Sequence, residues 1–255
     1  MIHRVVAPNP GPMTLSGTNT YLLSADGAVA VVDPGPEIDS HLEAILDAAR
    51  PLGEIRTVLV THRHSDHLPL AFPLCERTGA VLRGHARLPG VQRPLEDQEP
   101  CFGTLVALET PGHTVDSLSY WDPTSGDLFT GDLVIGTGTV VVDDTPGALA
   151  DYVGSLERLL ALHPRTIHPG HGPLVSDAQA RLHEYITHRQ QREQQVLSAL
   201  AALGSASVEQ LVAAIYTEVA PNLRPMAARN VRACLEKLSS EGRVSQSLER
   251  WQLTA

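Results

Sequence analysis

Residues 60–71 read VTHRHSDHLPLA and continue the apolar run IRTVLV of residues 55–60. The stretch places four potential metal ligands within six residues: His62, His64, Asp66 and His67. Histidine nitrogens and aspartate oxygens suit zinc or manganese. A loop that leaves a strand end can turn His62 and His64 toward one metal, because alternate residues share a face. Asp66 and His67 follow one turn later, where a second metal can bind.

Three further motifs each place a candidate ligand just after a strand-like run. TPGHT at residues 110–114 contains His113, TGD at residues 130–132 contains Asp132, and PGHG at residues 169–172 contains His171. Glycine beside a ligand lets the backbone approach a metal closely, and proline stiffens the turn that aims the side chain. We therefore add these three residues to the candidate metal site.

The first 170 or so residues alternate short β-rich runs with turn signals. The expected strands cover residues 20–24, 28–33, 55–60, 81–83, 104–109, 117–121, 128–130, 140–142 and 166–168. Apolar residues at helical spacing predict helices over residues 40–49 and 148–162. Strands with intervening helices predict a layered α/β core.

The rest of the chain has helical patterning and ends in the outline of a winged helix. A long polar helix is expected at residues 176–203, followed by helices at 207–216 and 225–240 and a hairpin at 243–253. We predict a catalytic core at 1–175, a connecting helix at 176–204 and a winged-helix-like module at 205–255. Such a module can read DNA with its second helix, which would make the chain a non-enzymatic regulator. Packing against the core is favoured, because acidic residues interrupt the arginines of this segment.

Composition limits the function further. With 255 residues, 42% of them hydrophobic, the chain can bury a full core. The net charge of −10 argues against broad, nonspecific nucleic-acid binding. Three cysteines without a CxxC spacing argue against a disulfide framework. We see neither a signal-peptide pattern nor an apolar run of about 20 residues, so we expect a cytoplasmic protein without a membrane segment.

Taken in order, these motifs resemble those of the metallo-β-lactamase-fold hydrolases over residues 9–175. The resemblance implies a four-layer αββα sandwich with a two-metal site at one edge. It implies that His62, His64 and His113 bind one metal, that Asp66, His67 and His171 bind the other, and that Asp132 bridges them. Asp33, in the VVDPG motif, would support the metal loop without binding metal. Zinc is favoured by the histidine content, and manganese and iron fit the same ligands.

NPGPMTLSGTNTYLL at residues 9–23, PGHGPLV at 169–175 and the C-terminal segment resemble the β-lactamase-like protein 2 subfamily more narrowly. That subfamily includes single-strand-specific endoribonucleases. One departure concerns Leu68, Pro69 and Leu70, because the family usually follows the Asp-His pair with one residue and then small glycines. This change puts the pocket shape in doubt. Asn19 is the first candidate for binding substrate, although its loop can equally be a simple turn.

The ligands predict hydrolysis by a water that two divalent ions activate, with Asp66 orienting that water and accepting its proton. The substrate stays open. A nuclease would act on single-stranded RNA, which could meet Arg224, Arg229, Arg232 and Trp251 of the module. An esterase or thioesterase would resemble the glyoxalase II and polyketide thioesterase branches, and a β-lactamase or lactonase is a lesser alternative. The oligomeric state also stays open, with a homodimer among the options.

Overall fold

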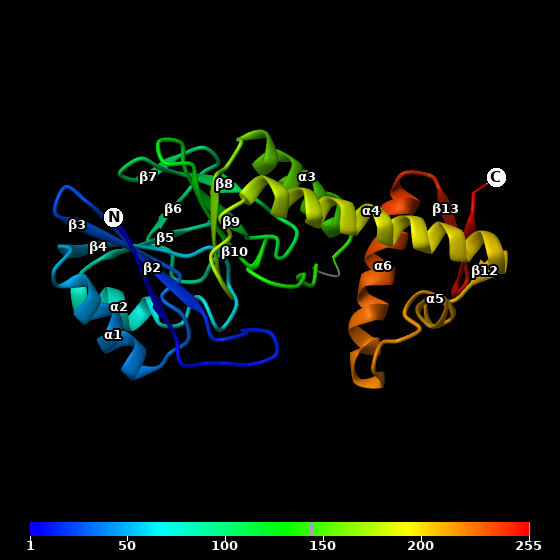
Figure 1. Ribbon diagram of the computed structural model, residues 1–255, viewed down its shortest axis with the longest axis horizontal. Helices are drawn as coiled ribbons and strands as arrows, with labels where there is room; N and C mark the ends of the chain where they lie inside the picture. Colours follow the sequence, from blue (N-terminus) through cyan, green and yellow to red (C-terminus); the bar gives the residue numbers. More distant parts are fainter. Residues whose placement is uncertain (143–144, 255) are drawn as a thin grey trace.

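Two β-sheets packed face to face form the body of the protein, and helices cover the outer face of each sheet (Figure 1). The computed structural model describes residues 1–142 and 145–254. A long helix leads from this sandwich to a small C-terminal module of helices and a short sheet. The expected αββα sandwich with a winged-helix-like domain is therefore confirmed.

The first sheet has six strands and is mixed. In spatial order its strands are β1 (Ile2–Val6), β2 (Asn19–Ala25), β3 (Ala28–Val32), β4 (Glu54–Leu59), β5 (Val81–Gly84) and β6 (Arg93–Pro94). The first three pair antiparallel, and the pairs from β3 to β6 are parallel. Helices α1 (Asp39–Ala49) and α2 (Ala71–Thr78) pack against this sheet.

The second sheet has five strands. In spatial order they are β11 (Thr166–Pro169), β10 (Asp127–Gly131), β9 (Leu118–Asp122), β8 (Leu105–Glu109) and β7 (Pro100–Phe102). Its outer face is covered by α3 (Ala148–Ala161) and the first half of α4 (Ala178–Leu203). The candidate ligands all follow strands of the two sheets, which brings them to one edge of the sandwich.

Side-chain alternation along the strands produces the layers. In β3, Val29 and Val31 pack toward α1 and α2, whereas Ala30 and Val32 pack between the sheets. In β10, Leu128 likewise joins the core under α3 and α4. Because successive side chains of a strand point to opposite faces, each doubly buried strand contributes to two cores. Such strands have continuous apolar sequences, as the run at residues 55–60 suggested.

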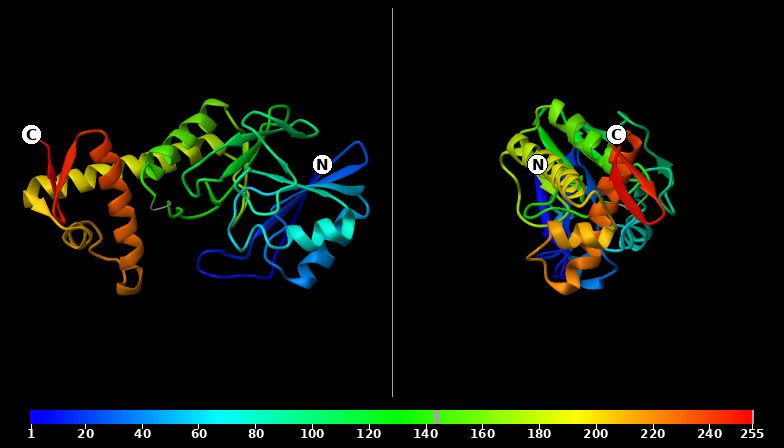
Figure 2. Two further views of the ribbon diagram at one scale, coloured as in Figure 1. Left: turned by 180° about the vertical axis from the view of Figure 1, so that it is seen from behind. Right: turned by 90° about the vertical axis from the view of Figure 1, so that its right-hand side faces the viewer.

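The C-terminal module is attached through α4. This helix has 26 residues and is about 39 Å long at the usual rise per residue. The module contains β12 (Ser205–Ala206), α5 (Val208–Ile215), the 3-10 helix η1 (Pro221–Leu223), α6 (Arg224–Ser240), β13 (Val244–Ser247) and β14 (Arg250–Leu253). Seen from behind in Figure 2, its sheet lies at the end of the molecule farthest from the N-terminal strands.

One continuous hydrophobic cluster joins the module to the sandwich. Val196 and Leu200 of α4 belong to the same cluster as Leu128 of β10 and Val231 of α6. The predicted division of the chain into three parts stays a prediction, since this one cluster contains residues of all three parts. Trp251 is buried in this cluster with 8% of its surface exposed. Its ring is therefore not available for stacking on RNA, contrary to the sequence-based expectation.

Residues 140–142 do not form a strand, so that prediction is wrong. Val140 and Val142 are buried, and this β-branched run produced the strand-like pattern. The carbonyl of Val140 accepts a hydrogen bond from Arg189, and that of Val141 lies 2.9 Å from the Nδ1 atom of His113. Side chains, not a neighbouring strand, bind these two carbonyls. Over the described ranges, no helix combines the length and hydropathy that crossing a membrane requires.

Candidate metal centre

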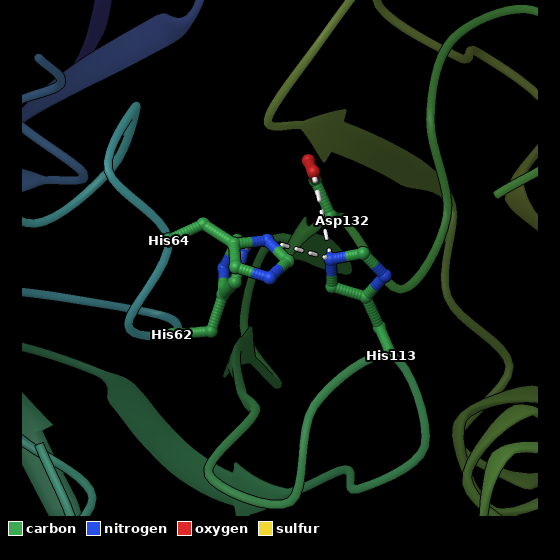
Figure 3. A group of neighbouring side chains, drawn as sticks. All are labelled: His62, His64, His113 and Asp132. Carbon is green, nitrogen blue, oxygen red and sulfur yellow. Dashed lines mark hydrogen bonds and ion pairs between the residues drawn. The ribbon is translucent and has the colours of Figure 1, made fainter. Parts of the chain in front are cut away.

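Three histidines from two loops converge at the edge of the sandwich (Figure 3). The Nδ1 atom of His64 lies 3.0 Å from the Nε2 atom of His62 and 3.1 Å from the Nε2 atom of His113. Two ligands of a tetrahedral zinc ion with ordinary bond lengths stand about 3.3 Å apart. The three nitrogens are therefore spaced as ligands of one ion.

In His113 and His62 the Nδ1 atom faces away from the other ligands, which leaves Nε2 facing the metal position. His113 donates from Nδ1 to the carbonyl of Val141, and the Nδ1 atom of His62 lies 3.0 Å from the hydroxyl of Thr61. When Nδ1 carries the proton, the Nε2 lone pair is left for a metal. His64 is the exception, because its Nδ1 atom faces the other two rings.

Asp66, His67 and His171 form a second group beside the first. The Nε2 atoms of His67 and His171 are 3.3 Å apart. The Oδ2 atom of Asp66 is 3.1 Å from the Nε2 atom of His171 and 3.7 Å from that of His67. Two nitrogens and one carboxylate oxygen are suitable ligands for a divalent transition metal.

Asp132 lies between the two groups. Its Oδ1 atom is 3.4 Å from the Nε2 atoms of both His67 and His171, and its Oδ2 atom is 3.7 Å from the Nε2 atom of His113. The Oδ1 atom is buried and has no hydrogen-bond partner among the described residues. A buried carboxylate oxygen without a partner is costly, and a cation at this position would remove that cost. The structure thus brings all seven predicted ligands together, with Asp132 placed to bridge.

Asp33 holds the metal loop from behind. Its Oδ1 atom accepts the backbone N–H of Thr61 at 2.7 Å, and its Oδ2 atom accepts the Thr61 hydroxyl at 2.7 Å. The same Oδ2 atom lies 2.9 Å from the Nδ1 atom of His67. A carboxylate that takes the outer N–H of a ligand histidine fixes its tautomer and orientation. Thr61 is a functional residue that the sequence analysis missed, since only the fold places its hydroxyl between Asp33 and His62.

Asn19 is buried under the loop that carries His171. Its side-chain amide donates to the carbonyls of Pro169 and Gly172, each at 2.9 Å, and 1% of the residue is exposed. Both amide hydrogens are thereby committed to the backbone. The predicted substrate contact does not fit this placement, and Asn19 instead supports the loop that carries His171. Nothing local indicates this role, because the partners lie about 150 residues away.

The leucines at the departure from the family pattern do not narrow the site. Leu68 and Leu70 are buried in the core between the first sheet and its outer helices. Pro69 precedes α2, and the N–H of Leu70 donates to the carbonyl of Gly35 at 3.0 Å. These residues therefore anchor the start of α2, and neither leucine lines the pockets beside the ligands.

The histidines of the two ligand groups differ in their pKa values. Burial lowers the pKa values of His62 and His64, which keeps these rings neutral at neutral pH. Burial also acts to lower the pKa of His171, but the nearby carboxylates of Asp132 and Asp66 outweigh it and raise that pKa to about 9. The pKa of His67 is raised well above its usual range, because Asp132 and Asp33 overcome the effect of burial. Without metal, His67 and His171 are therefore protonated at neutral pH, whereas His62 and His64 are neutral.

A groove leads from the ligands to the C-terminal module. A pocket of about 430 Å³ lies between His64, His113 and α6. Met13, Val141, Val142, Pro225 and Met226 form its apolar lining, and Arg63, Thr114 and Arg229 its polar lining. A smaller pocket of about 180 Å³ adjoins His113 and Asp132 on the side of Leu15, Ile135 and Val140. The module thus contributes one wall of the space in front of the first ligand group.

Comparison with known families agrees with this architecture. Residues 13–100 and 88–171 match the metallo-beta-lactamase superfamily, and residues 207–251 match the beta-lactamase associated winged helix domain. The chain belongs to the metallo-β-lactamase superfamily, whose members are typically hydrolytic enzymes, and carries this winged helix at its C-terminus.

Individual proteins with similar sequences or structures narrow the comparison within this superfamily. It is 35% identical over 273 residues to the Beta-lactamase-like protein 2 homolog of Drosophila melanogaster, covering 96% of this chain and 91% of that protein. It is 33% identical over 234 residues to the Atrochrysone carboxyl ACP thioesterase of Aspergillus fumigatus, covering 84% and 72%. A metallo-beta-lactamase family protein from Thermus thermophilus shares the fold, with a TM-score of 0.80, 24% identity and coverage of 99% and 98%.

Proposed function

We propose that this hydrolase cleaves a carboxylic thioester or ester whose apolar part lies in the groove between the first ligand group and α6. The observation that carries the proposal is the lining of that groove. Met13, Val142 and Met226 offer apolar surface beside His64 and His113. No Phe, Tyr or Trp ring contributes to either pocket among the described residues. Single-strand nucleic-acid sites usually have rings on which bases stack, so this lining favours an acyl chain.

The residues of the groove favour a thioester over an ester, because those that the structure describes include no group that can protonate a leaving oxygen. The titratable residues that line the groove, within the described part of the chain, are Arg63, His64, His113 and Arg229. Both histidines are candidate ligands, so neither is available to protonate a leaving oxygen. A thiol has a pKa of about 8.5 and departs readily as a thiolate. Cleavage of a thioester therefore needs no general acid from the protein.

The protein's own residues position the reaction. A bound divalent pair would act as a Lewis acid and lower the pKa of an attacking water. Asp66 has 25% of its side chain exposed, and its Oδ2 atom contacts His171. The contact with His171 contributes to lowering the pKa of this carboxyl, against the effect of burial. Asp66 is therefore ionised, and its second oxygen can orient the water and take its proton. An acyl chain in the groove would bring its carbonyl carbon to the side of His113, which lines the groove.

Cleavage of single-stranded RNA is the second candidate. It is favoured by Arg63 and Arg229, which line the groove from the metal loop and from α6. Arginine binds phosphate groups in a bidentate manner. The burial of Trp251 removes one of the contacts expected for RNA.

The deciding experiment is a comparison of substrates. Acetyl, hexanoyl and decanoyl thioesters of N-acetylcysteamine are offered to metal-loaded protein, and thiol release is followed. An end-labelled single-stranded RNA is tested in parallel, with Asp66→Ala prepared identically. We expect thioester cleavage that increases with chain length and disappears in the variant. RNA cleavage without thioester cleavage would reject the proposal in favour of the second candidate.

A further inference from the structure

Arg189 is a buried arginine of α4 that contacts no candidate ligand. Four per cent of its surface is exposed. Its Nη2 atom donates to the carbonyl of Val140 at 2.7 Å, and its guanidinium carbon lies 5.0 Å from the centre of the Tyr152 ring. In the described ranges it has no carboxylate partner. A buried guanidinium needs partners for its charge and its N–H groups, and the carbonyl of Val140 and the ring of Tyr152 are partners that the described residues supply.

The segment that Arg189 holds, residues 133–142, lies against the metal centre. It begins directly after Asp132, and the N–H of Gly136 donates to the carbonyl of His171 at 2.9 Å. Near its end, the carbonyl of Val141 accepts from the Nδ1 atom of His113. The segment therefore follows one candidate ligand in the chain and is hydrogen-bonded to two others.

Two more side chains of α4 hold the same segment. The Nη2 atom of Arg181 donates to the carbonyls of Ile135 and Gly138, at 3.1 and 2.7 Å. The hydroxyl of Tyr185 accepts the N–H of Ile135 at 3.2 Å. Side chains of α4 therefore hold the backbone of this segment at Ile135, Gly138 and Val140.

The same helix carries the winged helix. Glu193 lies one turn after Arg189 and forms an ion pair with Lys237 of α6, with a separation of 3.0 Å. Only about a tenth of each of these two side chains is exposed. Helix α6 also supplies Met226 to the groove. Helix α4 therefore contacts both α6, which forms a wall of the groove, and the segment that binds His113.

We propose that Arg189 is a positioning residue for the metal centre. By fixing the carbonyl of Val140, it orients the neighbouring carbonyl of Val141 and with it the ring of His113. Through α4 and the Glu193–Lys237 pair, it couples the winged helix to this one ligand. The inference does not depend on the substrate.

The test uses full-length protein stripped of metal and titrated with cobalt(II), with chelator competition for affinity and the d–d absorption spectrum for ligand geometry. Arg189→Met removes the hydrogen bond and the cation. Outer partners of metal ligands typically change metal affinity by 10–100-fold when removed. Because Arg189 acts through a carbonyl, we expect a loss of about tenfold in one of the two binding steps, with a changed spectrum.

Arg192→Met is the matched control on the same helix. Arg192 lies over the Tyr216 ring of the module at 4.2 Å, and its hydrogen bond goes to Gln195. This variant should keep the spectrum and affinity of the unmodified protein. Arg189→Lys, which keeps the cation, should weaken binding less than Arg189→Met, and it carries the test if the methionine variant does not fold.

Lys237→Met tests the link to the module and should shift the spectrum in the same direction by a smaller amount. A folded Arg189→Met protein with lower thermal stability but an unchanged cobalt spectrum and affinity would overturn the proposal. An unchanged Lys237→Met protein would overturn the coupling to the winged helix.

Discussion

The Oδ2 atom of Asp33 lies 2.9 Å from the Nδ1 atom of His67, and at most 2% of either side chain is exposed. The two residues are 34 positions apart, one following β3 and the other in the loop after β4. The parallel pairing of these strands brings their ends together. His67 is thereby held with its Nε2 atom toward His171.

Asp33→Asn should weaken metal binding at the second ligand group. The amide offers one acceptor oxygen where the carboxylate accepts two contacts from Thr61 and one from His67. We expect a loss of affinity of about 10–100-fold, measured by chelator competition. Asp127→Asn is a matched control, because Asp127 pairs with His168 at 3.0 Å away from the metal site. Equal losses in both variants would contradict the assigned role of Asp33.

Gly170→Ala should disturb the metal centre while leaving the fold intact. A Cβ atom at Gly170 would lie 2.7 Å from the Oδ1 atom of Asp132 and 2.7 Å from the Cε1 atom of His67. Both side chains are confined, so at least one ligand must move and bound metal per chain should fall. Gly154→Ala is the control, since Gly154 lies in α3 with no atom within 4 Å of the added carbon. It should stabilise the protein by up to about 1 kcal/mol, and unchanged metal content in Gly170→Ala would refute the prediction.

Metal binding should release protons and strengthen as the pH rises. In the metal-free protein, the raised pKa values of His67 and His171, the latter about 9, keep protons on the second group at pH 7. These protons compete with the metal, so affinity should increase from pH 7 toward pH 9 and proton release should decrease. The first group should change less, because the pKa values of His62 and His64 are lowered. Calorimetry in buffers of different ionisation enthalpy measures this release, and an absence of buffer dependence at pH 7 would refute the expectation.

Met226→Gln should alter chain-length preference, if the groove binds an acyl chain. The change keeps the side-chain length and makes its end polar. Losing apolar contact worth roughly 1.5 kcal/mol should lower kcat/KM for the decanoyl thioester about tenfold, with little change for the acetyl thioester. Leu248→Gln is the control, because Leu248 is 94% exposed at the β13–β14 turn. A uniform effect on all chain lengths would place the acyl chain elsewhere.

Much of the fold could be predicted because the local signals are strong. The run at residues 55–60 ends in the metal loop as expected, with β4 covering Glu54–Leu59. The polar helix predicted at 176–203 is observed as Ala178–Leu203. The strand predicted at 140–142 failed, because burial and β-branching are shared by strands and by buried loops whose backbone is satisfied by side chains.

The sequence by itself determined the identity and order of the seven candidate ligands. Each of them lies in a short contiguous motif whose residue types and spacing can be recognised without the fold. Tertiary structure alone decided that Asn19 supports the His171 loop, that Trp251 is buried and that α6 faces His113 across a groove. It also decided that Arg189 reaches Val140. The physical reason is distance along the chain. The contacts of Asn19 and Arg189 join residues about 150 and 49 positions apart, and a local sequence pattern does not specify which distant residue will pack against it.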